Sequence, residues 1–256
     1  MLLPKSSAFQ SAAGALPLWP AVLAVWGAGE ASGFHSHHTW HLIVGLDGTL
    51  RVRTKRGGPS ARTAAVLTRP DTLHAIDARG LQVFIVFVEP ETDMGARLAA
   101  MPTADVHVIP ERLVAAIRNV LNSARSQQDL ETAARRVVDE LGIPEARPPL
   151  RHPGVLRVLR HLRGEPDDCD DSLIALAKIA GLSSSRFMHV FTKDVGIPLR
   201  PYLRWLKLER AAAAIARSAS LTESAHAAGF ADGAHLTRSF RAMFGTTPTA
   251  LRRSHA

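Results

Sequence analysis

The sequence predicts a multidomain α+β protein with a β-rich N-terminal part, a helical middle and an all-α C-terminal part that contains two helix-turn-helix units. Three observations predict this class. Short β-branched segments punctuated by Gly, Pro and Asp fill residues 21–88. The apolar residues recur at helical period after residue 91. Two blocks, residues 173–203 and 220–251, each contain a short apolar helix, a turn, a second helix and then Pro.

The N-terminal part, which we assign to residues 1–100, is expected to contain several short strands. The sequence GLDG between LIV and LRVR is typical of a hairpin turn. Several short strands at this spacing indicate a small barrel or a sandwich. The expected strand segments are PAVLAVWGAG, WHLIVGLDGTLRVRT, TAAVLT and LQVFIVFVEP.

Residues 101–150 are expected to form helices that pack on the strands. The segment ERLVAAIRNVLNSA places four apolar residues on one stripe at helical period. This stripe can either pack on the core of its own chain or join two copies of the chain, and we expect it to contribute to a homodimer. Its residues are Leu113, Ile117, Val120 and Leu121.

A further helix in ETAARRVVDELG is expected to end at Gly142. The stretch EARPPLRHPG, residues 145–154, is rich in Pro and Arg and cannot continue a helix. It indicates a domain boundary near residue 150. The remaining residues, 151–256, are expected to form one all-α domain that begins with the helix GVLRVLRHLRG.

Each of the two C-terminal blocks is expected to present a probe helix. Gly181 makes the turn and Ser183 caps the second helix of the first block, and Gly229 and Asp232 have these roles in the second block. A probe helix that enters the major groove of DNA needs short or polar residues near its N-terminus, and groups that reach base edges. The outward residues that meet this need are Ser184, Ser185, Met188, His189 and Thr192 in the first block, and Gly233, His235, Arg238 and Arg241 in the second.

The positive charge of the chain is concentrated in the same region. The formal net charge is +8, and the chain from Arg151 onward has 16 Lys and Arg against 9 Asp and Glu. The first 150 residues have 15 against 14. This asymmetry favours a polyanionic partner, such as double-stranded DNA, for the C-terminal half. Arg238 is the best candidate for a guanine contact, because its guanidinium can pair with both O6 and N7.

The sequences LAKIAGLSSSRFMHVFTKDVGIPLRPYLRWLKLERA and AHAAGFADGAHLTRSFRAMFGTTPTALRR resemble the DNA-binding domain of AraC-type bacterial transcription regulators. The resemblance implies two helix-turn-helix units, bridged by a long helix over residues 198–217, that enter adjacent segments of the major groove. The chain has His189 where the family usually has Arg, Leu236 where it usually has an aromatic residue, and Ser224 where Ile is usual. Because imidazole reaches less far than guanidinium, the second unit is expected to carry more of the specificity.

The N-terminal part also carries a histidine cluster. His35, His37 and His41 have the same parity along the chain, so their side chains are expected to share one face. His38 has the opposite parity and is expected to point away. His74 lies in a later segment, RPDTLHAI.

These residues resemble the two motifs of the cupin barrel. His35, His37, His41 in a position usually held by Glu, and Gly48 match the first motif, and His74 matches the histidine of the second. Cupin-like barrels are also the usual sensor of AraC-type regulators, so the two resemblances agree. They imply a cupin-like effector-sensing domain.

Two kinds of effector fit this cluster. His35, His37, His41 and His74 could bind a divalent transition metal such as Ni²⁺, Zn²⁺, Co²⁺ or Cu²⁺, for which imidazole is a fitting ligand. Sensor cupins also use such a pocket for a small organic effector without metal. The sequence leaves both alternatives open.

Other features indicate where the protein works. The only cysteine, Cys169, excludes an internal disulfide and is typical of a reducing compartment. Pro4, Pro17 and Pro20 interrupt the apolar N-terminus, so a signal peptide is not expected. The longest apolar stretch is too short to span a bilayer. We therefore expect a cytoplasmic protein without a membrane partner.

We expect a sequence-specific DNA-binding transcription regulator that senses a ligand. The chain has no Gly-rich phosphate loop and no nucleophile with a matching base, so we do not expect an enzyme. A metal-dependent cupin enzyme is the rival class, but it does not explain the C-terminal half. A constitutive architectural DNA-binding protein is the other rival.

Overall fold

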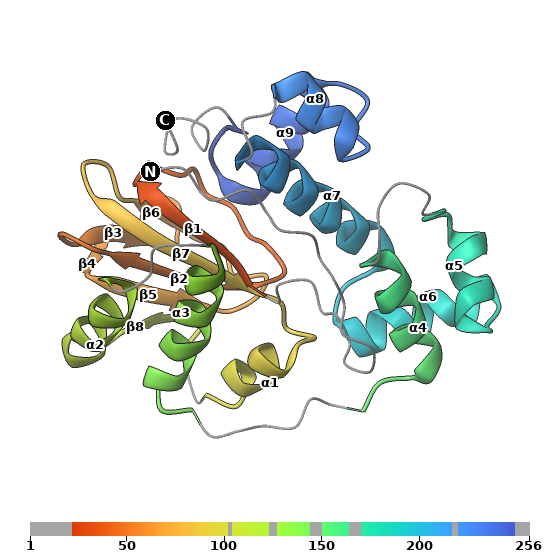
Figure 1. Ribbon diagram of the computed structural model, residues 1–256, viewed down its shortest axis with the longest axis horizontal. Helices are drawn as coiled ribbons and strands as arrows, with labels where there is room; N and C mark the ends of the chain where they lie inside the picture. Colours follow the sequence, from red (N-terminus) through yellow and green to blue (C-terminus); the bar gives the residue numbers. More distant parts are fainter. Residues whose placement is uncertain are drawn as a thin grey trace.

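The computed structural model describes residues 22–101, 104–122, 127–143, 150–163, 170–216 and 220–248 (Figure 1). A sheet-rich N-terminal part is followed by a helical C-terminal part. Cys169 and residues 145–149 of the expected linker lie outside the described residues. The proposed domain limits, 1–100, 101–150 and 151–256, stay predictions.

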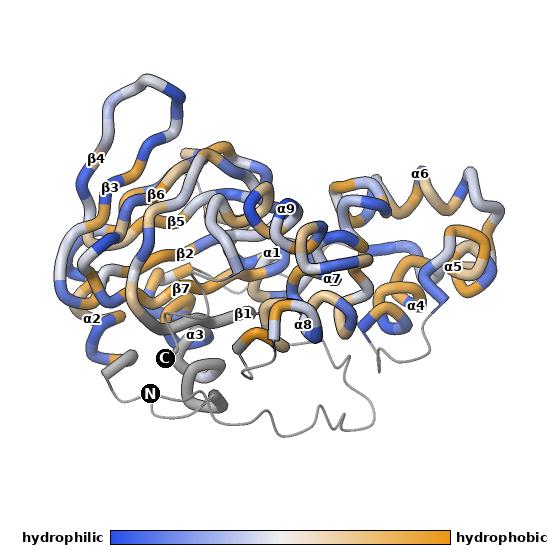
Figure 2. Tube along the Cα trace, turned by 90° about the horizontal axis from the view of Figure 1, so that it is seen from above, coloured by the Kyte–Doolittle hydropathy of each residue, from blue (hydrophilic) through white to orange (hydrophobic). Residues whose placement is uncertain are grey.

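The strands form two antiparallel sheets. One sheet has five strands in the order β1-β7-β2-β5-β8, and the other has three in the order β4-β3-β6. The loop between β3 and β4 is hydrophilic and projects from the sheets (Figure 2). The strands are Val22–Ala28 (β1), Trp40–Gly45 (β2), Leu50–Arg53 (β3), Ala61–Thr63 (β4), Ala65–Thr68 (β5), Ala75–Asp77 (β6), Gln82–Val88 (β7) and Val106–Val108 (β8).

The predicted hairpin at GLDG is wrong, because β2 and β3 lie in different sheets. Strand β2 pairs with β5 on one side and with β7 on the other, so it has no free edge for β3. All six of its residues are buried, as expected for a central strand covered on both faces. The described strands form two sheets, and a closed barrel is not found among them.

Three helices cover the five-stranded sheet (Figure 1). In the second of them, Val114 and Ile117 are fully buried in the sheet core, and Leu113 and Val120 are partly buried against it. Three members of the apolar stripe therefore face the core of their own chain, while the side chain of Leu121 lies outside the described part. The homodimer stays a prediction. These helices are Asp93–Ala99 (α1), Glu111–Asn122 (α2) and Gln127–Glu140 (α3).

The C-terminal part contains two helix pairs, α5–α6 and α8–α9, at opposite ends of the long helix α7 (Figure 1). One apolar cluster joins α4, α5 and α6 to the first half of α7, and a second joins its other half to α8 and α9. No described helix is long and apolar enough to cross a membrane. The helices are Pro153–Leu162 (α4), Leu173–Ala180 (α5), Ser184–Val195 (α6), Leu199–Ala216 (α7), Leu221–Ala227 (α8) and Gly233–Phe244 (α9).

The predicted turns and caps of these helix pairs are confirmed. Gly181 ends α5 with a φ of 67°, and Gly229 has a φ of 73°. A glycine takes this left-handed conformation without the steric cost that other residues meet. The Ser183 side chain accepts a hydrogen bond from the Arg186 amide, and Asp232 accepts one from the His235 amide. These bonds satisfy amides that a helix N-terminus leaves unpaired.

Candidate functional site

The four predicted histidines lie together in the sheet-rich part, and all four are buried. One ring nitrogen from each of His35, His37 and His74 lies within 4.8 Å of the other two. The fourth, His41, is close by: its Nδ1 lies 3.2 Å from Nε2 of His74. The predicted convergence of these side chains is therefore confirmed, while their role as metal ligands stays a prediction.

Backbone carbonyls fix the orientation of two of these rings. Nδ1 of His35 donates to the Gly33 carbonyl at 2.8 Å, and Nδ1 of His74 donates to the Thr72 carbonyl at 2.8 Å. In neutral imidazole a protonated Nδ1 leaves Nε2 with a lone pair. Both histidines therefore present an Nε2 acceptor, as a metal ligand must.

His37 and His41 are oriented in a similar way. Nδ1 of His37 lies 2.9 Å from the hydroxyl oxygen of Thr39. Since Nε2 of His74 is an acceptor, Nδ1 of His41 donates to it. Among the described residues, Nε2 of His37 and Nε2 of His41 have no hydrogen-bond partner, although both are buried. An unpaired buried polar atom costs about 1–3 kcal/mol, so a ligand that engages these atoms would gain that free energy.

Burial keeps the cluster uncharged. Desolvation lowers the pKa of His35, and lowers the pKa values of His37 and His41 well below their usual range. Desolvation also lowers the pKa of His74, to about 4. All four imidazoles are therefore neutral at pH 7. Neutral imidazole is the form that binds a metal.

The histidine cluster lies where the sheet meets the C-terminal helices. The Phe87 ring on β7 stacks on His41 with centroids 4.6 Å apart, and contacts His37 edge-on at 5.2 Å. Phe87 is also buried in the apolar cluster of the C-terminal helices, where it meets Trp205 and Phe244 with centroids 6.1 and 5.6 Å apart. One ring thus contacts both the histidines and the helical part.

His38 points away from the cluster, as predicted. Its Nδ1 lies 2.7 Å from a carboxylate oxygen of Asp71, and its Nε2 lies 3.0 Å from the Val195 carbonyl oxygen. Both partners can only accept, so both ring nitrogens donate and His38 is an imidazolium. Burial lowers the pKa of His38. The hydrogen bond to Asp71 and the negative charge of Asp71 outweigh burial, so the pKa is raised above its usual value. A cation is favourable at the C-terminus of α6 because of the helix dipole.

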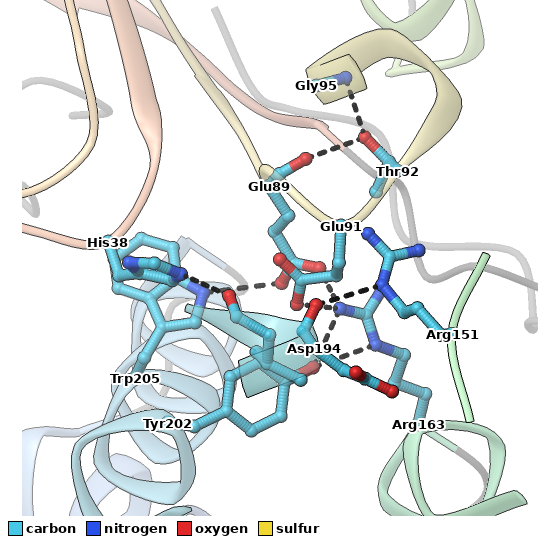
Figure 3. A network of polar contacts seen from close by, with 11 residues as sticks. His38, Glu89, Glu91, Thr92, Gly95, Arg151, Arg163, Asp194, Tyr202 and Trp205 are labelled. Carbon is cyan, nitrogen blue, oxygen red and sulfur yellow. Dashed lines mark hydrogen bonds and ion pairs between the residues drawn. The ribbon is translucent and has the colours of Figure 1, made fainter. Parts of the chain in front are cut away.

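A buried polar network also joins the two parts (Figure 3). Arg163, just after α4, donates to Glu89 and, at 2.9 Å, to Glu91. The same guanidinium donates to the Tyr202 hydroxyl at 2.8 Å, and the Trp205 indole N–H donates to Glu89 at 3.3 Å. Desolvation raises the pKa of Glu89 to about 7, because it outweighs the opposing charge of Arg163.

The predicted DNA-contacting residues lie on the two second helices, α6 and α9, which we call the probe helices. Their inward neighbours Phe187, Val190, Phe191, Leu236 and Phe240 are buried. Six predicted contact residues are exposed and three are partly buried, so the predicted outward orientation agrees with the structure. The exposed ones are Ser185, Met188, His189, His235, Arg238 and Arg241, and the partly buried ones are Ser184, Thr192 and Gly233.

Residues 176–254, which span nearly all of both helix pairs, match the family described as a helix-turn-helix domain. Two curated relatives match a similar length. They are the HTH-type transcriptional regulator GlxA of Rhizobium meliloti, 31% identical over 103 residues, and the transcriptional activator NphR of a Rhodococcus species, 33% identical over 101 residues. The matches cover 40% and 39% of this chain, and 32% and 30% of the relatives.

Residues 176–254 form an AraC-type helix-turn-helix domain. The identification made from the sequence is confirmed for this part of the chain. The matched stretches span about a third of the length of the relatives.

The fold of nearly the whole chain is similar to that of ToxT from Vibrio cholerae. An apo ToxT variant gives a TM-score of 0.59 over 92% of this chain and 98% of ToxT, with 8% identity. Wild-type ToxT with bound unsaturated fatty acid gives a TM-score of 0.56 over 91% of this chain and 95% of ToxT, with 8% identity. This similarity concerns the fold alone.

The sequence did not reveal the residues that join the AraC-type domain to the sheets. Glu89 and Arg163 lie outside the stretches that resemble the AraC-type domain, and the bond between them spans 74 residues. Trp205 lies inside one of these stretches, but nothing in the sequence indicated Glu89 as its partner. His38 had a detectable signal, its opposite parity, but nothing in the sequence indicated Val195 as its partner.

Proposed function

We propose that the protein is a transcription regulator that binds double-stranded DNA through α6 and α9 of its AraC-type domain, and that a ligand at the histidine cluster changes this binding. The names of the relatives and the basic charge of the C-terminal half support DNA binding. The exposed Arg238 and Arg241 on α9 supply groups that can reach bases and phosphates.

For the ligand we propose a divalent transition metal. The observation that carries this proposal is the convergence of ring nitrogens of His35, His37 and His74 within 4.8 Å. The rings are neutral, and backbone carbonyls hold the Nδ1 atoms of His35 and His74, which leaves the lone pair of each ring on Nε2. A metal at Nε2 of His74 would replace the hydrogen bond from Nδ1 of His41. His41 is the candidate fourth ligand. A borderline ion such as Ni²⁺, Co²⁺, Zn²⁺ or Cu²⁺ suits such an all-imidazole set.

A small organic effector is the second candidate. ToxT, which has a similar fold, is known with an unsaturated fatty acid bound. In this chain, the aromatic rings of Phe87 and Trp205 beside the histidines would supply an apolar contact, and an unpaired Nε2 would supply a hydrogen-bonding group. With an organic effector, the protein would still be a transcription regulator with its ligand at the histidine cluster.

Isothermal titration calorimetry on protein purified without a histidine tag separates the two candidates. We expect one of Ni²⁺, Co²⁺, Zn²⁺ or Cu²⁺ to bind tighter than about 10 μM, roughly −7 kcal/mol. His37→Ala should weaken binding strongly. His107→Ala is the matched control, because His107 lies on β8 outside the cluster. If none of the four ions binds more tightly than this, the metal proposal fails and the organic effector takes its place.

A further inference from the structure

The segment that carries two of the candidate ligands also contacts both probe helices. Residues 33–38 run alongside the sheets, and His35 and His37 point from this segment into the histidine cluster. The residues at its two ends, Gly33 and His38, contact the AraC-type domain instead.

Gly33 holds the end of α9. Its amide donates to the Gly245 carbonyl at 2.7 Å, and Gly245 is the C-cap of α9. The approach is close: a Cβ on Gly245 would lie 2.5 Å from the Gly33 carbonyl oxygen and 2.6 Å from Nδ1 of His35. The Gly33 carbonyl is also the acceptor that orients the His35 ring. A candidate ligand and the end of a probe helix therefore depend on the same residue.

His38 holds the end of α6 in the corresponding position. Its Nε2 donates to the carbonyl of Val195, the last residue of α6. The next residue, Gly196, is the C-cap of α6, and a Cβ there would lie 3.3 Å from the His38 ring. The two contacts are equivalent, since each is made at the C-terminal cap of a probe helix.

We propose that residues 33–38 form a clamp that fixes the positions of α6 and α9 relative to each other, and that a ligand at the histidine cluster changes DNA binding by moving this clamp. The second clause rests on the proposed function. The physical reason is spacing: two probe helices must match two segments of the major groove at once, so a shift at either C-cap changes the fit. His35 and His37 lie between Gly33 and His38 in this segment. A ligand that draws the two rings toward a common centre would therefore also shift Gly33 and His38.

Two variants break the two contacts separately. His38→Ala removes the bond to Val195. Gly245→Ala places a methyl group against Gly33 and His35, and also strains a residue whose φ is 67°. Gly142→Ala is the matched control for strain, because Gly142, two residues beyond α3, has the same φ of 67° and a Cβ there would meet nothing within 4 Å. His107→Ala controls for the loss of a histidine.

The measurement is fluorescence anisotropy of the full-length protein on a DNA fragment that the wild type selects from a random-sequence library. Without metal, His38→Ala and Gly245→Ala should each change the dissociation constant by about threefold or more, and the two controls should not. With Ni²⁺, the wild type should respond by about fivefold or more, and both clamp variants should lose the response. His38→Ala should still bind Ni²⁺ in calorimetry, because His38 is not one of the candidate ligands.

The outcomes separate the clamp from the metal part of the proposed function. If the clamp variants bind DNA like the wild type without metal, and keep the full Ni²⁺ response, the clamp is rejected. If the variants change DNA affinity without metal but the wild type does not respond to Ni²⁺, the clamp stands and the metal part of the proposed function fails. A protein that selects no DNA fragment overturns both.

Discussion

The guanidinium of Arg163 lies 2.9 Å from a carboxylate oxygen of Glu91, and both side chains are almost completely buried. The pair joins the end of α4 to the segment between β7 and α1, and so joins the helical C-terminal part to the sheets. Glu89 binds the same guanidinium. Glu89 and Glu91 thus share one guanidinium, and all three side chains are almost completely buried.

Removing this cation should destabilise the whole protein. Arg163→Met leaves Glu89 and Glu91 buried without their cation, and breaking a buried pair in this way costs about 3–5 kcal/mol. Urea unfolding measures the loss. The triple variant with Glu89→Gln and Glu91→Gln should recover part of it, because no uncompensated charge remains. Arg79→Met, which breaks an exposed pair with Asp77, is the control and should leave stability unchanged. Equal stability of Arg163→Met and the wild type would contradict the account.

Glu89 should make stability depend on pH. Desolvation raises its pKa in the folded protein from 4.5 to about 7, so the folded state binds its proton more tightly than the unfolded state does. The stability that this carboxyl contributes is therefore fully present below pH 4.5 and is lost as the pH rises to about 7, a loss on the order of 1–3 kcal/mol.

Glu89→Gln should remove this share of the pH dependence. The buried histidines act in the opposite direction, because their lowered pKa values reduce stability below pH 6.5. The informative quantity is therefore the difference in unfolding free energy between wild type and variant at pH 5, 6, 7 and 8. A difference that stays constant over this range would show that Glu89 does not titrate there.

Thr39 should matter for metal binding although it is not a ligand. Its hydroxyl holds Nδ1 of His37, and losing a group that orients a ligand typically costs about 10–100-fold in metal affinity. Thr39→Val should weaken Ni²⁺ binding in calorimetry by that factor. Thr68→Val is the matched control: the Thr68 hydroxyl is also buried but has no partner among the described residues. Equal effects of the two substitutions would remove the orienting role from Thr39.

Arg238 should contribute to reading the DNA sequence. It is exposed on α9, and Arg238→Ala should weaken specific binding by about 1–3 kcal/mol and relax the preference at one base pair. Anisotropy titrations against a set of single-base variants of the selected DNA fragment test this. Uniform weakening at every position would instead indicate a phosphate contact.

The parts of the fold that could be predicted from the sequence depend on local rules. Ser183 and Asp232 cap their helices because short polar side chains reach nearby amides, and this reach is visible in four residues of sequence. The ring of His37 lies near those of both His35 and His41, as the shared parity of the three residues predicted. The AraC-type resemblance depended on a longer but still continuous pattern.

The prediction that was wrong, and the contacts that were not predicted, depend on segments that are distant in the sequence. The turn sequence GLDG is compatible with a hairpin, but β2 is already paired on both edges by β5 and β7, which come later in the chain. The bond between His38 and Val195 spans 157 residues. No periodicity links single polar residues at such a distance, so only the folded structure shows them together.

A Ni²⁺ titration tests the proposal that the histidine cluster controls DNA binding. The DNA affinity of the wild type and of His37→Ala is measured by anisotropy during a Ni²⁺ titration, with His107→Ala as the control. We expect Ni²⁺ to change the DNA affinity of the wild type and of His107→Ala by about fivefold or more, and to leave that of His37→Ala unchanged. Identical responses of His37→Ala and the wild type, or no response in either, would contradict it.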